Sequence, residues 1–152
     1  MRTTIAETVW ADLAGPEHAP GLEQIYEGYL LHYGRPRRAR GEDDRLLHGD
    51  EQYARGLAQV AELDDPEAIA ALAELIGLAS RERAEHAAET DDFALWAATA
   101  RFLADRSERD AYHAALVSLR DARDPAPLEA LVDGLELQRE RAAHRRLAGS
   151  AG

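Results

Sequence analysis

The chain contains neither cysteine nor lysine, and each absence excludes a class of chemistry. Without cysteine there can be no disulfide, no thiolate zinc site and no cysteine nucleophile. Without lysine there can be no Schiff base, no anchor for pyridoxal phosphate and no P-loop contact with a nucleotide. All 18 basic residues are therefore arginine, and with abundant alanine this composition is typical of a GC-rich bacterial genome.

Long apolar runs are also missing. The longest are far shorter than the roughly 20 residues that a membrane-spanning helix needs. No signal-peptide pattern follows Met1, so we expect a cytoplasmic protein with no membrane span. The net charge of −11 argues against a nucleic-acid partner, because phosphate neutralisation supplies most non-specific affinity for nucleic acids.

Helical periodicity is what the sequence does contain. Residues 22–33 carry apolar side chains at the spacing of one helix face. These are Leu22, Ile25, Tyr26, Tyr29, Leu30 and Tyr33. Similar segments predict about six to seven helices, whereas sustained period-two alternation is absent. We therefore predict an all-α, single-domain bundle over residues 1–148, followed by a disordered tail at 149–152.

The best-specified boundary lies at Leu63–Pro66, between two of these helices. Asp64 or Asp65 can cap the second helix, and Pro66 fits its first position because no N–H donor is needed there. Glu67 then places a negative charge at the positive end of the helix dipole. The predicted buried positions are Leu46, Leu47, Tyr53, Leu57 and Val60 before the hinge and Ile69, Leu72, Leu75, Ile76 and Leu78 after it.

From Leu22 to His86 the chain resembles the trans-isoprenyl diphosphate synthases, the polyprenyl synthetase family. Three short motifs carry the resemblance. They are Gly34-Arg35-Pro36, similar to the family's arginine- and glycine-rich loop, Leu46-Leu47-His48-Gly49-Asp50, similar to its leucine-rich helix with a Gly-Asp pair, and the following helix from Asp65 to Ile69. The resemblance covers less than half of the chain and implies an all-helical fold and an isoprenoid diphosphate ligand.

The chain also departs from the pattern of that family. Such enzymes hold Mg²⁺ with clustered aspartates that bridge the substrate diphosphate. At the corresponding place this chain has Leu30-Leu31-His32-Tyr33, which offers no carboxylate. The family's lysines are absent as well. We therefore expect a shortened, non-catalytic relative with no catalytic residue, no metal and no cofactor.

An arginine cluster is the first candidate binding site. Arg35, Arg37, Arg38 and Arg40 could hold a phosphate or diphosphate through bidentate guanidinium contacts. The alternative, which we favour, is an exposed loop that balances nearby acidic helices or docks onto Glu42, Asp43 and Asp44.

A tyrosine-rich helix face is the second candidate. Tyr26, Tyr29 and Tyr33, together with Trp96, suit a homodimer or protein-partner interface, and the alternative is that they fill the monomer core. Three acid–histidine pairs could each offer two metal ligands, although a structural or solvated role is favoured. They are Asp44/His48, Glu82/His86 and Asp110/His113.

The sequence thus favours a non-catalytic helical binding or assembly protein that acts through self-association or a protein partner. The alternative is an isoprenoid- or diphosphate-binding protein, or a prenyltransferase-like enzyme, that uses the Arg35–Arg40 loop. The missing aspartates and lysines favour the first of these.

Overall fold

A computed structural model describes residues 7–38, 44–86 and 91–149 of the chain. These residues form eight α-helices and no strand, so the all-α bundle is confirmed. The helices are α1 (Ala11–Ala14), α2 (Ala19–Tyr33), α3 (Arg45–Ala61), α4 (Pro66–His86), α5 (Phe93–Ala104), α6 (Arg109–Ala122), α7 (Ala126–Val132) and α8 (Gln138–Ala148). In this part of the chain no helix combines the length and apolarity that crossing a bilayer requires.

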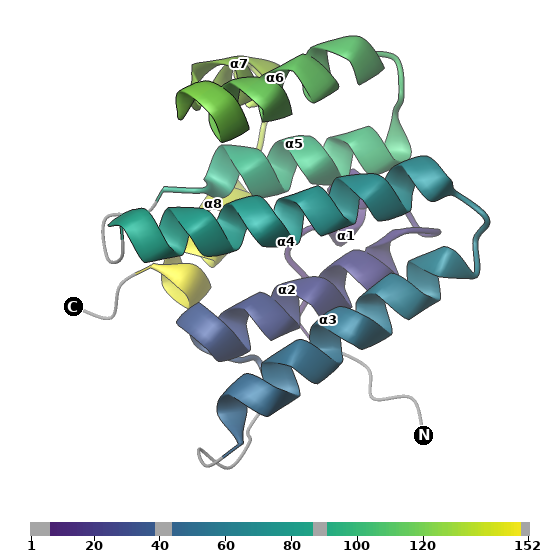
Figure 1. Cartoon of the computed structure of the whole chain (residues 1–152), viewed down its shortest axis with the longest axis vertical. Coiled ribbons are helices and arrows are strands. Elements are labelled where there is room, and N and C mark those ends of the chain that lie inside the picture. The colour runs from purple at the N-terminus through teal and green to yellow at the C-terminus, as the bar shows by residue number, and fades with distance from the viewer. Residues whose placement is uncertain (1–6, 39–43, 87–90, 150–152) are drawn as a thin grey trace.

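The helices are arranged around α4 and α5, which run side by side across the middle of the molecule (Figure 1). The pair α2 and α3 lies on one side of them, and α6 and α7 lie on the other. The short α1 packs on α2 and α5, whereas α8 returns to the end of α2. One continuous apolar core joins these elements.

Glycines allow α2 and α3 to pack at backbone contact. A Cβ atom built on Gly28 would lie 2.7 Å from the carbonyl oxygen of Gly49, and one on Gly56 would lie 2.7 Å from that of Gly21. The obstructing atoms belong to the backbone, so no side-chain rotation can relieve the clash. The Gly-Asp pair of the family-like motif thus has a packing role here, because Gly49 is one of the contact residues.

This glycine contact also decides which face of α3 is buried. The buried face consists of Gly49, Gln52, Gly56 and Val60. The predicted burial of Leu46 and Leu47 is wrong, since their side chains are 63% and 67% exposed. Both leucines point away from the glycine-centred face, whereas the other predicted positions of α3 do pack against the core.

The hinge before α4 forms as predicted. The Asp65 carboxylate accepts a hydrogen bond of 3.2 Å from the Ala68 N–H, and Pro66 opens the helix. Asp64 instead adopts the left-handed conformation with φ +53°. Asp65 is therefore the capping residue.

Arginines from the α5–α6 junction pair with the two carboxylates of this hinge. Arg106 contacts Asp65 at 2.6 Å and Glu67 at 2.9 Å, and Arg109 contacts Glu67 at 2.5 Å. The hydrogen bonds of Arg106 lower the pKa of Asp65 to about 2, and those of Arg109 lower the pKa of Glu67 to about 2. The hinge is thus tied electrostatically to the other half of the bundle.

The two ends of the chain differ from the prediction. Helix α1 begins only after Trp10, and residues 150–152 of the predicted tail lie outside the described residues. The last part of the bundle forms two helices, α7 and α8, so that the described residues form eight helices instead of the six to seven predicted. Gly134, with φ +87°, lies at the break. The apolar pattern continues through Leu135 and Leu137, so periodicity alone could not reveal this break.

The predicted tyrosine interface lies largely inside the core. Tyr26, Tyr29 and Trp96 are fully buried, with ring centroids 5.0 Å apart for Tyr26–Trp96 and 4.9 Å apart for Tyr29–Trp96. Three of the four predicted interface residues therefore have no surface for a partner to contact, because their rings fill the space between α2 and α5. Tyr33, at 37% exposure, is the exception.

Candidate functional site

The arginine loop folds back onto α2 instead of projecting into solvent. The Arg37 side chain is 2% exposed and pairs with Glu23 at 2.5 Å and with Glu27 at 2.9 Å. The Glu23 carboxylate also accepts hydrogen bonds from the backbone N–H groups of Val9 and Trp10. The Glu27 carboxylate accepts them from the backbone N–H groups of Arg37 and Arg38. Two buried carboxylates thus fix the loop and the N-terminal segment.

This arrangement contradicts the predicted phosphate site at its central residue. Arg37 is enclosed and already neutralised, so a phosphate cannot reach its guanidinium. Arg35 is exposed, and Arg38 binds Glu27 through its backbone N–H. Arg40 lies outside the described residues, as do Glu42 and Asp43, the expected docking partners. Among the described residues, the acids that bind Arg37 are Glu23 and Glu27 of α2.

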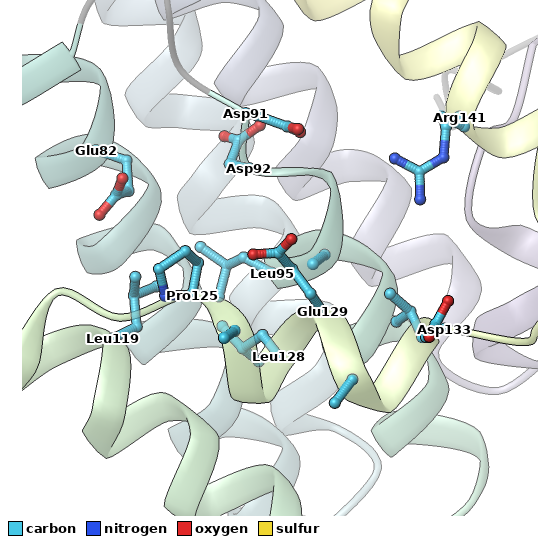
Figure 2. Close-up of a pocket in the computed structure, with 14 residues that line it drawn as sticks. Glu82, Asp91, Asp92, Leu95, Leu119, Pro125, Leu128, Glu129, Asp133 and Arg141 are labelled. Carbon is cyan, nitrogen blue, oxygen red and sulfur yellow. The ribbon is translucent and has the colours of Figure 1, made fainter.

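A separate cleft opens between α4, α5, α7 and α8, with a volume of about 580 Å³ (Figure 2). Its floor is apolar and includes Leu95, Leu119, Leu128 and Val132. Its charged side chains are Glu82, Asp91, Asp92, Glu129, Asp133 and Arg141. Figure 2 shows Asp91 and Glu129 projecting toward the same space as Arg141, which reaches in from α8. The cleft therefore combines an apolar surface with an excess of negative charge.

Three of these carboxylates lack an ion-pair partner among the described residues. They are Asp91, Glu129 and Asp133, although most described arginines pair with an acid. The Asp91 side chain accepts only the Phe93 N–H, at 3.4 Å. Asp133 is the C-cap of α7, where the helix dipole disfavours a negative charge. Helix stability therefore does not explain why an acid stands there.

Arg141 leaves these acids unpaired despite lining the same cleft. Its guanidinium carbon lies 4.2 Å from the centroid of the Phe93 ring, which is the geometry of a cation–π contact. Arg141 is thus engaged by an aromatic ring next to the cleft and not by the carboxylates that line it.

The inner wall of the cleft is formed by Asp92, a buried residue at the start of α5. His144 donates from Nε2 to one Asp92 oxygen at 2.8 Å, and the Tyr29 hydroxyl donates to the other. The Tyr26 hydroxyl forms a hydrogen bond of 2.7 Å with His144 Nδ1, and Arg83 donates from Nε to the Tyr29 hydroxyl at 2.7 Å. Both arms of this network end at the Asp92 carboxylate, one through His144 and the other through Tyr29.

The network keeps Asp92 ionised. Burial by itself raises the pKa of a carboxyl group, but the hydrogen bonds from His144 and Tyr29 and the charge of Arg83 outweigh it, so that the pKa of Asp92 is lowered. Burial next to this charge raises the pKa of Tyr29 well above its ordinary value. Tyr29 therefore stays a hydrogen-bond donor, and the Asp92 carboxylate gives the inner wall of the cleft a fixed negative charge.

The predicted acid–histidine pairs do not converge. Glu82 and His86 lie 3.7 Å apart on α4, whereas His113 approaches Glu67 at 3.4 Å instead of Asp110. His48 contacts Asp44 only through the helix backbone. Within residues 7–38, 44–86 and 91–149, no three acidic or histidine side chains are grouped so as to hold a metal ion.

Comparison with protein-family models, curated proteins and solved structures finds no match to this chain. The resemblance to isoprenyl diphosphate synthases therefore stays a prediction that rests on the motifs between Leu22 and His86.

Proposed function

We propose that this chain is a non-catalytic helical binding protein whose site is the cleft between α4, α5, α7 and α8. The observation that carries the proposal is the combination of an apolar floor with carboxylates that have no counter-ion in the described structure. The ligand that fits is an organic cation: an ammonium or guanidinium group on an apolar stem. The cleft volume of about 580 Å³ lies within the usual range of small-molecule sites, about 300–1,000 Å³.

Electrostatics favours a cation over a neutral or anionic ligand. Five carboxylates line the cleft against one guanidinium. Unpaired like charges that face one space repel each other, and a bound cation relieves that repulsion. The ionised Asp92 adds a charge that solvent screens poorly, because it is buried behind the wall. The apolar stem would cover Pro125, Ala126 and Ala130, which are the exposed apolar residues among those that line the cleft.

The residue types support binding over covalent chemistry. The described residues that line the cleft include no serine, threonine or histidine. Hydroxyl and imidazole groups supply the usual nucleophile and base pair, so no such pair is assembled here.

The proposal is tested by titrating the purified chain with hexylamine and hexanol in a calorimeter. We expect hexylamine to bind and hexanol to bind at least tenfold more weakly, since a charge difference of about 1.4 kcal/mol gives that ratio. Glu129→Gln and Asp133→Asn should each weaken hexylamine binding about two- to fivefold, the effect of about 0.5–1 kcal/mol per exposed charge.

Glu51→Gln supplies the matched control, because it removes an exposed carboxylate from α3 on the far side of the bundle (Figure 1). Equal binding of hexylamine and hexanol would contradict the proposal, as would an equal effect of all three substitutions.

Self-association also stays a proposal, on a different surface from the predicted tyrosine face. Leu46 and Leu47 are exposed at the start of α3, and Tyr33 is exposed at the end of α2 that lies beside it. A diphosphate-binding function has less support, because Arg37 is enclosed by Glu23 and Glu27.

A further inference from the structure

His144, the side chain that Asp92 holds, is surrounded by aromatic rings. Its ring centroid lies 5.6 Å from that of Trp10, 5.7 Å from that of Tyr26, 6.0 Å from that of Phe93 and 6.4 Å from that of Tyr29. These four rings around His144, which is hydrogen-bonded to the Asp92 carboxylate, are called the aromatic enclosure below. Electron-rich ring faces beside a carboxylate are the chemistry that recognises organic cations, including alkylated ammonium groups.

Helix α8 places two basic side chains next to Phe93. Arg141 lies over the Phe93 ring from the cleft, and His144, one helical turn later, fills the aromatic enclosure. The helix is rich in arginine, in a chain whose net charge is −11. One helix thus places two basic groups where a ligand cation would lie.

Helix α8 joins the apolar core at its C-terminal end, whereas its middle is attached through polar contacts. Of its eleven residues, those that are buried are Glu140, His144, Leu147 and Ala148. His144 is the member of this set whose ring reaches the centre of the aromatic core. Its two hydrogen bonds, to Tyr26 and Asp92, are therefore the principal polar attachment of the middle of α8.

A buried N–H donor without an acceptor among the described residues lies at the aromatic enclosure, and the imidazole of His144 does not satisfy it. The indole Nε1–H of Trp10 is buried and has no acceptor in the described structure, although Trp10 is fully enclosed. Buried N–H groups are nearly always paired, so this donor marks an unmet requirement. A ligand that carries an oxygen acceptor beside its cationic group would meet it.

We propose that the aromatic enclosure is a binding site for an organic cation bearing a hydroxyl or carbonyl oxygen, and that the His144 side chain of α8 fills this site when no ligand is bound. A ligand admitted through the cleft displaces His144 from Asp92 and releases α8. The inference rests on the proposed function, because the cleft is the route of entry. His144 then competes with the ligand. The apparent affinity is therefore the intrinsic affinity multiplied by the fraction of chains in which His144 has left the site.

Choline and its uncharged carbon isostere neohexanol test the inference. Calorimetry on the wild-type chain should show choline binding at least tenfold tighter than neohexanol binding. Choline should also accelerate amide hydrogen exchange in α8, because the displaced helix opens.

Two variants weaken or remove the contact of His144 with this site. Tyr26→Phe keeps the ring of the enclosure but removes the hydroxyl that holds His144, so choline should bind about two- to tenfold tighter. It leaves no cavity, so the tightening cannot come from space created by a deletion. His144→Ala removes the occupant and should tighten binding more than tenfold. Arg145→Ala is the control, since it removes an exposed arginine from the same helix.

The outcomes separate this inference from the proposed function. Unchanged choline affinity in Tyr26→Phe, or unchanged exchange in α8 on choline binding, would overturn the inference even if hexylamine still depends on Glu129 and Asp133. Tighter choline binding in Tyr26→Phe would support the aromatic enclosure as a binding site. If Glu129→Gln at the same time left hexylamine binding unchanged, the cleft would be refuted as the site of the proposed function.

Discussion

Replacing Arg37 with methionine should destabilise the fold more than any other single charge removal in the chain. The substitution keeps an unbranched stem of similar length but removes the one cation that lies between Glu23 and Glu27. Both carboxylates are buried, at 4% and 0% side-chain exposure. Removing one partner of a buried ion pair costs about 3–5 kcal/mol, because the remaining charge is left uncompensated.

Two further contacts would be lost with the guanidinium. Arg37 donates to the carbonyl oxygens of Glu7 and Glu23, at 2.7 and 2.8 Å. The carboxylates would still accept their backbone N–H groups, which limits the damage. We therefore expect a loss of about 3–5 kcal/mol, against a total stability of about 5–15 kcal/mol for a domain of this kind.

Urea denaturation followed by circular dichroism at neutral pH measures this loss as a shift of the midpoint. Arg55→Met is the matched control, because Arg55 forms an exposed pair with Glu51 and should cost less than about 1 kcal/mol. Combining Arg37→Met with Glu23→Gln and Glu27→Gln should recover part of the stability, since no buried charge then remains in this cluster. Equal midpoints for Arg37→Met and Arg55→Met would refute the reasoning.

Three further predictions concern packing, pH and assembly. Gly28→Ala should destabilise the fold by about 1–3 kcal/mol through its clash with the α3 backbone, whereas Gly77→Ala, which has nothing within 4 Å, should stabilise it by about 0.5–1 kcal/mol; urea midpoints compare the two. Because the pKa values of Asp65 and Glu67 are lowered to about 2, the stability they contribute is present above about pH 4.5 and is lost as the pH falls toward 2, and thermal melts at several pH values measure it. An unchanged melting temperature across that interval would contradict the pairing. Sedimentation at micromolar concentration should show a dimer that Leu46→Glu dissociates; a wild-type species of 16.7 kDa that is unchanged on dilution would contradict self-association.

Local features of the sequence predicted much of the fold. The stripe over residues 22–33 gives α2, and the cap at Asp65 with Pro66 gives the start of α4. These features succeed because a helix face and a helix cap are each decided within a few residues. The exposure of Leu46 and Leu47 was missed for the opposite reason: the orientation of α3 depends on Gly49 and Gly56 meeting the backbone of another helix.

The candidate site could not be predicted in the same way. Glu129, Asp133 and Arg141 stand in segments whose sequence resembles an ordinary solvated helix surface. Their meeting depends on the break at Gly134, which turns α8 back against α5. One signal was present in the sequence: Glu23 and Glu27 interrupt an apolar helix at a spacing of four residues, and such acids require a buried cation.

The most direct test of the central claim is a nitrogen–proton correlation spectrum of the isotope-labelled chain recorded during titration with hexylamine. The account predicts shifts concentrated on the amides of Leu95, Glu129, Asp133 and Arg141, which line the cleft, with the α2–α3 pair little affected. Shifts concentrated on α2 and α3, or no saturable shifts at millimolar hexylamine, would contradict the claim that the cleft is the binding site.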